Sequence, residues 1–227
     1  VISAARSQQF RWNKGGAENF RKMLVRILKS KNITLKTKLH GIVHLLNSTM
    51  FLSVLIVAIL SVPMLYIKHQ YAFIQGYFVA LSFFIITTII YFMCYWHMYK
   101  TVHGKGFKNF IAYIGMFFTF FSIAMGFSIH NTLAVIEGHL GMKSDFIRTP
   151  KFNLNASNKN WKENKYISNK ISVSTILEGL LMLYFAFGMF SSFLVKEHGV
   201  DFGLFPFHLM LFLGFGYVFV QSLKTHN

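Results

Sequence analysis

Long apolar stretches with almost no charged residues constrain this chain more than any other feature of its sequence. A helix that crosses a membrane needs about 20 mainly apolar residues, since each residue advances it by only about 1.5 Å. Stretches of this kind cover residues 47–67, 71–97, 109–130, 174–195 and 203–223. The pattern predicts an all-α membrane protein.

The composition and the distribution of charge support this prediction. Hydrophobic residues make up 54% of the 227 residues and charged residues only 13%, whereas soluble domains are about 45–50% apolar and about 25% charged. The 23 Lys and Arg outnumber the 7 Asp and Glu, and they concentrate in residues 1–40 and 143–170. Basic segments between apolar spans are typical of cytoplasmic loops, so a nucleic-acid partner is not expected. A single cysteine, Cys94, excludes an internal disulfide and a cysteine-rich zinc site.

The charge pattern also predicts a topology with about four transmembrane helices and additional amphipathic interface helices. The N-terminal segment is expected to be cytoplasmic. The basic loops 98–108 and 143–170 would lie on opposite sides of the membrane if residues 109–130 crossed it. We therefore expect residues 109–130 to lie in the interface or to re-enter it; the alternative is a fifth span.

Five regions follow from this topology. They are an interface-helix region (1–40), a transmembrane hairpin (41–98), an interfacial or re-entrant helix (99–142), a cytoplasmic segment (143–172) and a second hairpin (173–227). Because the chain begins at Val1 without a methionine or a signal-peptide pattern, we expect it to be the C-terminal part of a larger protein.

The basic N-terminal region contains an amphipathic helix over residues 18–29. Its apolar residues recur at helical spacing, and four basic residues occupy the other face. The apolar residues are Phe20, Met23, Leu24, Ile27 and Leu28. Such a helix is expected to lie on an anionic membrane surface, although a solvated helix of a soluble domain would show the same spacing.

Two short motifs are the candidates for chemistry. Gln8, Arg11 and Trp12 form the pattern Q-x-x-R-W just before the amphipathic helix. The second motif lies in the basic segment 143–172 and comprises Phe146, Arg148, Thr149 and Lys151. The seven acidic residues form no close pair suited to acid–base catalysis, and no D-x-D or phosphate-binding loop is present. The chain therefore does not hold a whole active site or a metal site of its own.

Together, in this order, the motifs resemble the C-terminal membrane half of a processive family-two glycosyltransferase of the cellulose synthase and cellulose-synthase-like type. In that family Q-x-x-R-W lies on an interface helix at the entrance of a polysaccharide channel, and F-x-V-T-x-K forms a gating loop. The stretch QQFRWNKGGAENFRKM is similar in particular to plant-type mannan and xyloglucan-backbone synthases. Arg148 stands where the family usually has valine, so nucleotide contacts there are expected to differ.

The resemblance implies roles for these residues. Arg11 would stabilise the diphosphate leaving group, Trp12 would offer a flat ring to the acceptor sugar, and Gln8 would bind the acceptor or position Trp12. Thr149 and Lys151 would close over the nucleotide. The alternatives are that Arg11 and Trp12 are interfacial anchors and that the second motif is a basic loop contacting lipid headgroups.

The resemblance also implies a cytosolic α/β catalytic domain that is absent from this chain. That domain would hold a divalent metal, Mg²⁺ or Mn²⁺, and would supply the catalytic carboxylates. The expected partners are a nucleotide sugar (UDP-glucose or GDP-mannose), the growing polysaccharide and membrane lipid. The chain alone is expected to be inactive, and its expected location is the bacterial inner (plasma) membrane.

Glu178 is a further candidate because an acidic residue in a span indicates function. It would line the channel, or it would cap the cytoplasmic end of its helix within reach of water. Two other functions remain open for the chain as a whole: a non-enzymatic transporter or channel subunit, and a non-processive glycosyltransferase that acts on a lipid-linked acceptor.

Overall fold

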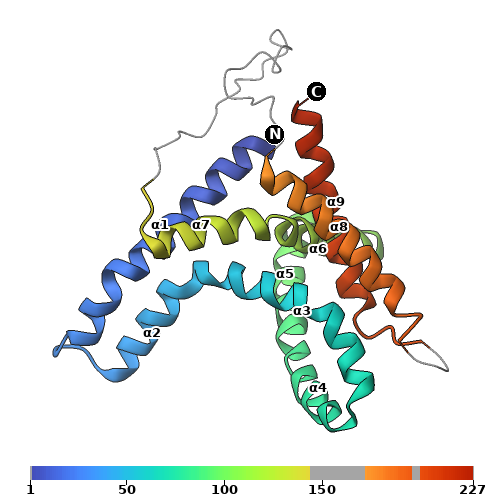
Figure 1. The fold of residues 1–227 in the computed structure, drawn as a ribbon, viewed down its shortest axis with the longest axis horizontal. Helices are drawn as coiled ribbons and strands as arrows, with labels where there is room; N and C mark the ends of the chain where they lie inside the picture. Colours follow the sequence, from blue (N-terminus) through green and yellow to red (C-terminus); the bar gives the residue numbers. More distant parts are fainter. Residues whose placement is uncertain (1, 144–171, 196–199, 227) are drawn as a thin grey trace.

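The computed structural model describes residues 2–143, 172–195 and 200–226, which form helices joined by short connections (Figure 1). Within these ranges no β-strand occurs. By length and composition, five helical stretches are able to cross a membrane: Leu35–Gln70, Gln75–His103, Phe107–Gly126, Val173–Ser191 and Phe205–Lys224. The predicted all-α membrane fold is therefore confirmed.

The α-helices follow one another with few intervening residues. Their bounds are α1 Ile2–Lys29, α2 Leu35–Leu45, α3 Met50–Gln70, α4 Gln75–Ser82, α5 Ile85–His103, α6 Phe107–Gly126, α7 Ser128–Leu140, α8 Val173–Ser191 and α9 Phe205–His226. Two short 3-10 helices, Leu46–Thr49 and Ala72–Ile74, join α2 to α3 and α3 to α4.

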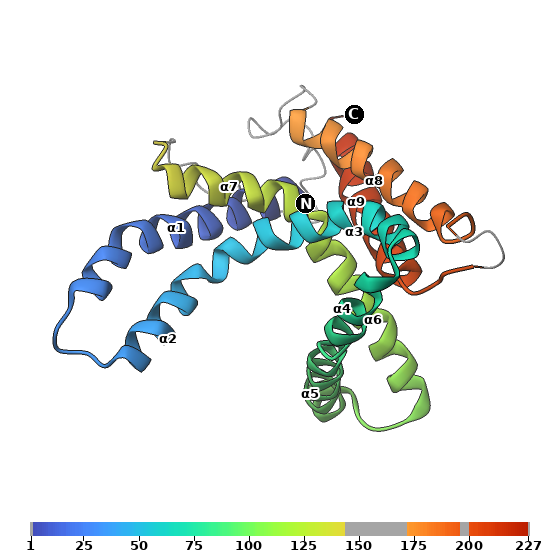
Figure 2. The same ribbon diagram turned by 60° about the horizontal axis from the view of Figure 1, so that its bottom comes forward.

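Helices α1, α2 and α7 form an arm that extends to one side of the remaining helices (Figures 1 and 2). The predicted helix over 18–29 is confirmed as the second half of the longer α1. Part of its apolar face packs against protein: Ile27 lies next to Gly41 of α2, and the ring of Phe20 meets His139 of α7. Met23 and Leu28 stay exposed. Lipid can therefore reach only part of the predicted apolar face.

Helices α3, α8 and α9 enclose the hydrophobic core beside this arm. Phe185 of α8 stacks on Phe215 of α9 with ring centroids 5.7 Å apart. The buried cluster also contains Ala58, Val62, Leu211 and, from α7, Ile129. Pro63 cannot donate a hydrogen bond to the carbonyl of Ile59, four residues earlier. The hydroxyl of Tyr184 donates to that carbonyl instead, at 2.6 Å. A backbone group that lipid cannot satisfy thus has a partner within the protein.

The bundle is closed at the end far from α1 by a cluster around Asp201. One carboxylate oxygen accepts from Lys68 at 2.8 Å and from His69 at 2.6 Å, and the other accepts from the Gly203 amide at 2.9 Å. Burial alone would raise the pKa of Asp201, but these hydrogen bonds outweigh it and hold the pKa far below its usual range. Two turns were predicted to lie outside, at residues 68–70 and 196–202. Asp201 of the second turn thus lies beside Lys68 and His69 of the first, while residues 196–199 lie outside the described ranges.

Helices α6 and α7 share the apolar segment 109–130 that the charge pattern assigned to the interface. Phe127 alone separates the end of α6 from the start of α7. Helix α6 is long and apolar enough to span and packs along α9, whereas α7 turns away and lies along α1 (Figure 2). Residues 109–130 therefore contain most of α6, which is able to span a membrane, and the start of α7, whose 13 residues are too few to span one.

Small residues bring α6 and α9 into backbone contact. A Cβ atom on Gly214 would lie 1.9 Å from the Ser122 carbonyl oxygen, and one on Gly126 would lie 2.3 Å from the Gly214 carbonyl oxygen. Close crossings of this kind are typical of membrane helices, where association depends on van der Waals packing and not on the hydrophobic effect.

We predict that Gly214→Ala destabilises the protein by about 1–3 kcal/mol, the scale of overpacking at a filled site. The loss arises because both nearest atoms belong to the backbone of α6 and cannot rotate away. Thermal unfolding in nanodiscs measures it. Gly115→Ala is the control. Gly115 lies on α6, the helix that Gly214 of α9 meets, and a Cβ atom there has nothing within 4 Å. Equal melting temperatures for the two variants would contradict the predicted crossing.

Candidate functional site

The Q-x-x-R-W motif lies in the first half of α1, on the side away from α7. At about 100° per residue, Gln8, Arg11 and Trp12 fall within an arc of about 100°. Trp12 is 64% exposed, whereas Asn13 and Ala17 on the other side of the helix are buried. Arg11 Nε donates to the Ser7 carbonyl at 3.3 Å, which directs the guanidinium along the helix. Gln8 and Arg11 are half-buried. The structure therefore brings the three motif residues together on one face of α1, on which Trp12 is exposed.

The opposite face of α1 packs in parallel against α7. Lys14 Nζ donates to Glu137 at 2.8 Å, and Gly138 lies directly against the backbone and side chains of α1. A Cβ on Gly138 would lie 2.6 Å from the Lys14 carbonyl oxygen, so glycine permits this approach. The contact fixes the rotation of α1 about its axis, and with it the direction of Trp12.

His130 joins the first turns of α1 and α7. Its Nε2 lies 3.0 Å from the Arg6 carbonyl oxygen, and its ring meets Phe10 at 5.4 Å between centroids. The pKa of His130 is lowered from 6.5 to about 4. Burial is the main cause and the charge of Arg6 adds to it, while the bond to the Arg6 carbonyl and the charge of Glu137 oppose the change. The imidazole is therefore neutral at physiological pH and donates its ring N–H to the carbonyl.

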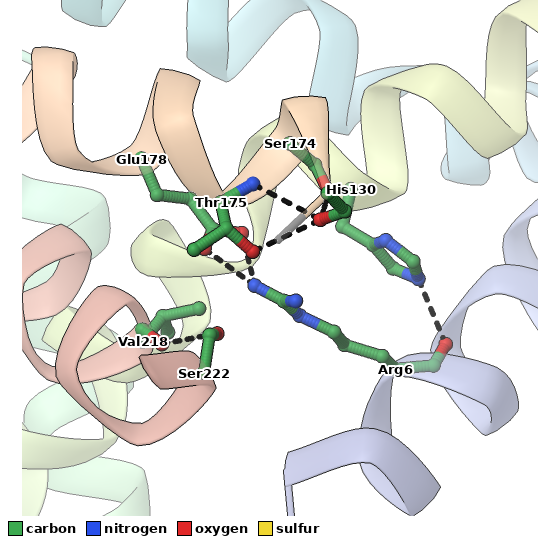
Figure 3. A network of polar contacts seen from close by, with 8 residues as sticks. Arg6, His130, Ser174, Thr175, Glu178, Val218 and Ser222 are labelled. Carbon is green, nitrogen blue, oxygen red and sulfur yellow. Dashed lines mark hydrogen bonds and ion pairs between the residues drawn. The ribbon is translucent and has the colours of Figure 1, made fainter. Parts of the chain in front are cut away.

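An ion pair between Arg6 of α1 and Glu178 of α8 lies at the centre of this junction (Figure 3). The Glu178 side chain is fully buried and that of Arg6 is 14% exposed. One guanidinium nitrogen donates to both carboxylate oxygens. Glu178 was expected to line a channel or to cap a helix end near water. The structure places it in a buried pair, and a role in a channel stays a prediction.

Several buried polar atoms of α1 and α7 have no partner among the described residues. They are Arg6 Nε, Ser128 Oγ, Asn131 Oδ1 and Thr132 Oγ1. Three of the four belong to the first turns of α7, where Asn131 meets Gln9 of α1. Buried polar atoms usually bind protein or ordered water, so this junction has capacity for additional hydrogen bonds.

The second motif, with Phe146, Arg148, Thr149 and Lys151, lies outside the described residues. The described ends on either side of it both lie near α1. Gly141, at the end of α7, contacts Arg21. Ser172 caps the start of α8 by accepting from the amide of Thr175, which lies close to the pair of Arg6 with Glu178 (Figure 3). Trp12 lies between these two positions along α1.

The described carboxylates are all engaged by basic side chains. Glu18 lies 3.5 Å from Lys22, and the other three are Glu137, Glu178 and Asp201, paired as described above. No group of three or more His, Cys, Asp or Glu side chains suited to a metal occurs in the described ranges. The described site can thus offer cations, an aromatic ring and hydrogen-bond donors.

Sequence reasoning missed Arg6, His130 and Asn131 as members of this junction. Polar residues at the end of an apolar stretch were the available signal for His130 and Asn131. Arg6 carried no comparable signal, because one arginine among ten basic residues in positions 1–40 does not reveal a partner 172 positions away.

Comparisons with protein-family models, curated proteins and solved structures found no match to this chain. Its fold and composition define it as an all-α membrane protein with a basic helical arm.

We predict that removing one partner of the buried pair, as in Glu178→Met, lowers stability by about 3–5 kcal/mol, because Arg6 is left buried and uncompensated. The double variant Arg6→Met/Glu178→Met should recover most of the loss. Thermal unfolding of all four forms gives the coupling energy. Lys22→Gln, which breaks the exposed pair with Glu18, should change stability by less than about 0.5 kcal/mol. Additive effects of the two Met substitutions would argue against a buried pair.

A second prediction concerns pH. Because the pKa of His130 is lower in the folded chain (about 4) than its ordinary value of 6.5, the unfolded chain binds more protons between these values. Stability should therefore fall as the pH drops from 6.5 towards 4, by roughly 1–3 kcal/mol from this residue. His130→Gln should flatten that part of the profile, while the exposed His40→Gln should leave it unchanged. Identical profiles for wild type and His130→Gln would refute this assignment.

Proposed function

We propose that this chain is the membrane part of a processive, inverting glycosyltransferase that polymerises a β-linked polysaccharide from a nucleotide sugar and moves it across the membrane. The observation that carries the proposal is the placement of Gln8, Arg11 and Trp12 together on the open face of α1. The opposite face of α1 is held rigidly against α7 and α8. An open face with a cation and an exposed indole suits a sugar acceptor and a diphosphate.

In this proposal Trp12 stacks on the terminal sugar of the acceptor. Arg11 supplies a fixed cation on the side where the nucleotide diphosphate leaves, and Gln8 binds an acceptor hydroxyl or orients Trp12. Phe146, Arg148, Thr149 and Lys151 belong to the segment that would meet the nucleotide. These roles come from the resemblance of the motifs. The position of Gln8, Arg11 and Trp12 on one face of α1 supports the roles of these three residues.

The reacting carboxylates and the divalent metal would come from a separate catalytic domain. This division of labour agrees with the pairing of Glu18, Glu137, Glu178 and Asp201 with basic side chains of this chain, which engages the described carboxylates in structural contacts. The donor would be UDP-glucose or GDP-mannose. The basic arm would face the cytoplasm at the bacterial inner (plasma) membrane, where anionic lipid and the soluble nucleotide sugar are both present.

We predict that Trp12→Ala in the full protein abolishes polymer formation while the protein still inserts and unfolds at the wild-type temperature. The exposed side chain makes few contacts to lose, so the effect should be on activity and not on stability. Polymer synthesis in membrane vesicles supplied with each nucleotide sugar measures it. Asn19→Ala, two turns further along the same exposed side of α1, is the matched control and should stay active.

Unchanged polymer in Trp12→Ala would remove this residue from the site. Transfer of a single sugar to a lipid acceptor, with no polymer, would favour the non-processive enzyme. The absence of any transfer by the full protein would favour a transporter or channel subunit.

A further inference from the structure

A long apolar groove runs along the outer side of α6 and α9 and has no part in the site on α1. Its volume is about 810 Å³, and its lining extends along α9 from Pro206 to Lys224. Eighteen residues of helix advance about 27 Å, close to the hydrocarbon thickness of a bilayer. The groove therefore follows the depth of the membrane and lies on a surface that lipid would contact.

The close crossing of α6 and α9 creates this groove. The two helices touch at Gly126 and Gly214, and Thr119 of α6 and Leu213 of α9 line the groove beside this contact. Helix α6 then ends at Gly126, while α9 continues to His226. One end of the groove is consequently open beside the last turns of α9.

The open end of the groove is polar and cationic, unlike the rest. Tyr217, Gln221 and Lys224 line it at positions i, i+4 and i+7 of one face of α9. Neither α6 nor α9 contains an Asp or a Glu that would neutralise the ammonium group of Lys224. An occupant that complements this site has a long apolar chain and an anionic head.

This end lies on the same side of the bundle as the interface arm. Helix α9 contacts α1, and Ser222, two residues before Lys224, lies near the pair of Arg6 with Glu178 (Figure 3). The basic side of a membrane protein faces the leaflet that is rich in anionic lipid. The chemistry of the groove and its position thus both favour an occupant with an apolar chain and an anionic head.

We propose that the groove between α6 and α9 binds an acyl chain of an anionic phospholipid whose headgroup lies beside Lys224. The site is separate from the face of α1 that carries the proposed glycosyltransferase function, and the inference stands whether or not that function is correct. Bound lipid would fill the groove beside the contact between α6 and α9.

The test uses the full protein in nanodiscs that contain equal amounts of phosphatidylglycerol and phosphatidylcholine. In each sample one of the two lipids carries a photoactivatable group on its acyl chain, and mass spectrometry locates the crosslinked peptides. Phosphatidylglycerol should label the groove residues of α6 and α9 about fivefold more than phosphatidylcholine, the scale of one basic residue near an anionic surface. Labelling of α4 and α5 should show no such preference.

Lys224→Gln should reduce the preference for phosphatidylglycerol to nearly one, while Lys36→Gln, an exposed basic residue of α2, should leave it unchanged. Thr119→Trp should fill the groove and reduce labelling by both lipids. Equal labelling by the two lipids in the wild type, or a preference that survives Lys224→Gln, would overturn the proposal. Protein–protein crosslinks between groove residues of two copies, or competition by a polyprenyl phosphate but not by phosphatidylglycerol, would overturn it as well.

Discussion

The buried pair of Arg6 with Glu178 is the interaction on which the arrangement of the interface arm depends. Two charges removed from water are tolerated only when they neutralise each other, so the start of α1 must lie at the start of α8. This requirement turns the Arg6 side of α1 inward. Because Trp12 lies about 120° from Arg6 around the helix, the same requirement turns Trp12 outward. A structural ion pair thus determines which residues of α1 remain available for binding.

The two ends of the bundle use polar groups in different ways. At the far end, the carboxylate of Asp201 joins Lys68 and His69 of α3 to the start of α9, and the cluster closes the bundle. At the near end, Arg6 and Glu178 form a single buried pair, and side-chain oxygens of Ser128, Asn131 and Thr132 in the first turns of α7 have no partner among the described residues. The far end keeps one such atom as well, Ser192 Oγ. The two ends therefore differ in their ionic groups, a shared carboxylate at one and a single pair at the other.

Much of the helical architecture could be predicted from the sequence, because apolar stretches of membrane length have few alternatives to a helix. The stretches 47–67 and 203–223 correspond closely to α3 and α9. The stretch 71–97 became two helices, α4 and α5, and the segment 109–130 was divided between α6 and α7. Charge counting assigns a segment to one side or to the interface as a whole, so it could not predict a turn at Phe127.

The candidate site was predictable only where its residues are neighbours in sequence. Gln8, Arg11 and Trp12 lie within two turns of one helix, and helix geometry alone puts them on one face. The residues that α1 contacts on other helices could not be predicted in this way. Arg6 meets Glu178 across 172 positions and His130 across 124, and no local spacing encodes these contacts. Long-range polar pairs arise from the way whole helices pack, which hydropathy does not specify.

The position of α1 rests on contacts at several points along its length, which matters for any chemistry on its open face. Arg6 holds its first turns to α8, Lys14 holds its middle to Glu137, and Gly16 lies directly against Ser48. Contacts spaced over three turns resist tilting as well as rotation. Trp12, between the first two contacts, is therefore fixed relative to the bundle even though its ring is exposed. If a growing polymer ends at Trp12 as proposed, its last sugar would keep a constant position relative to the membrane helices through each cycle of transfer.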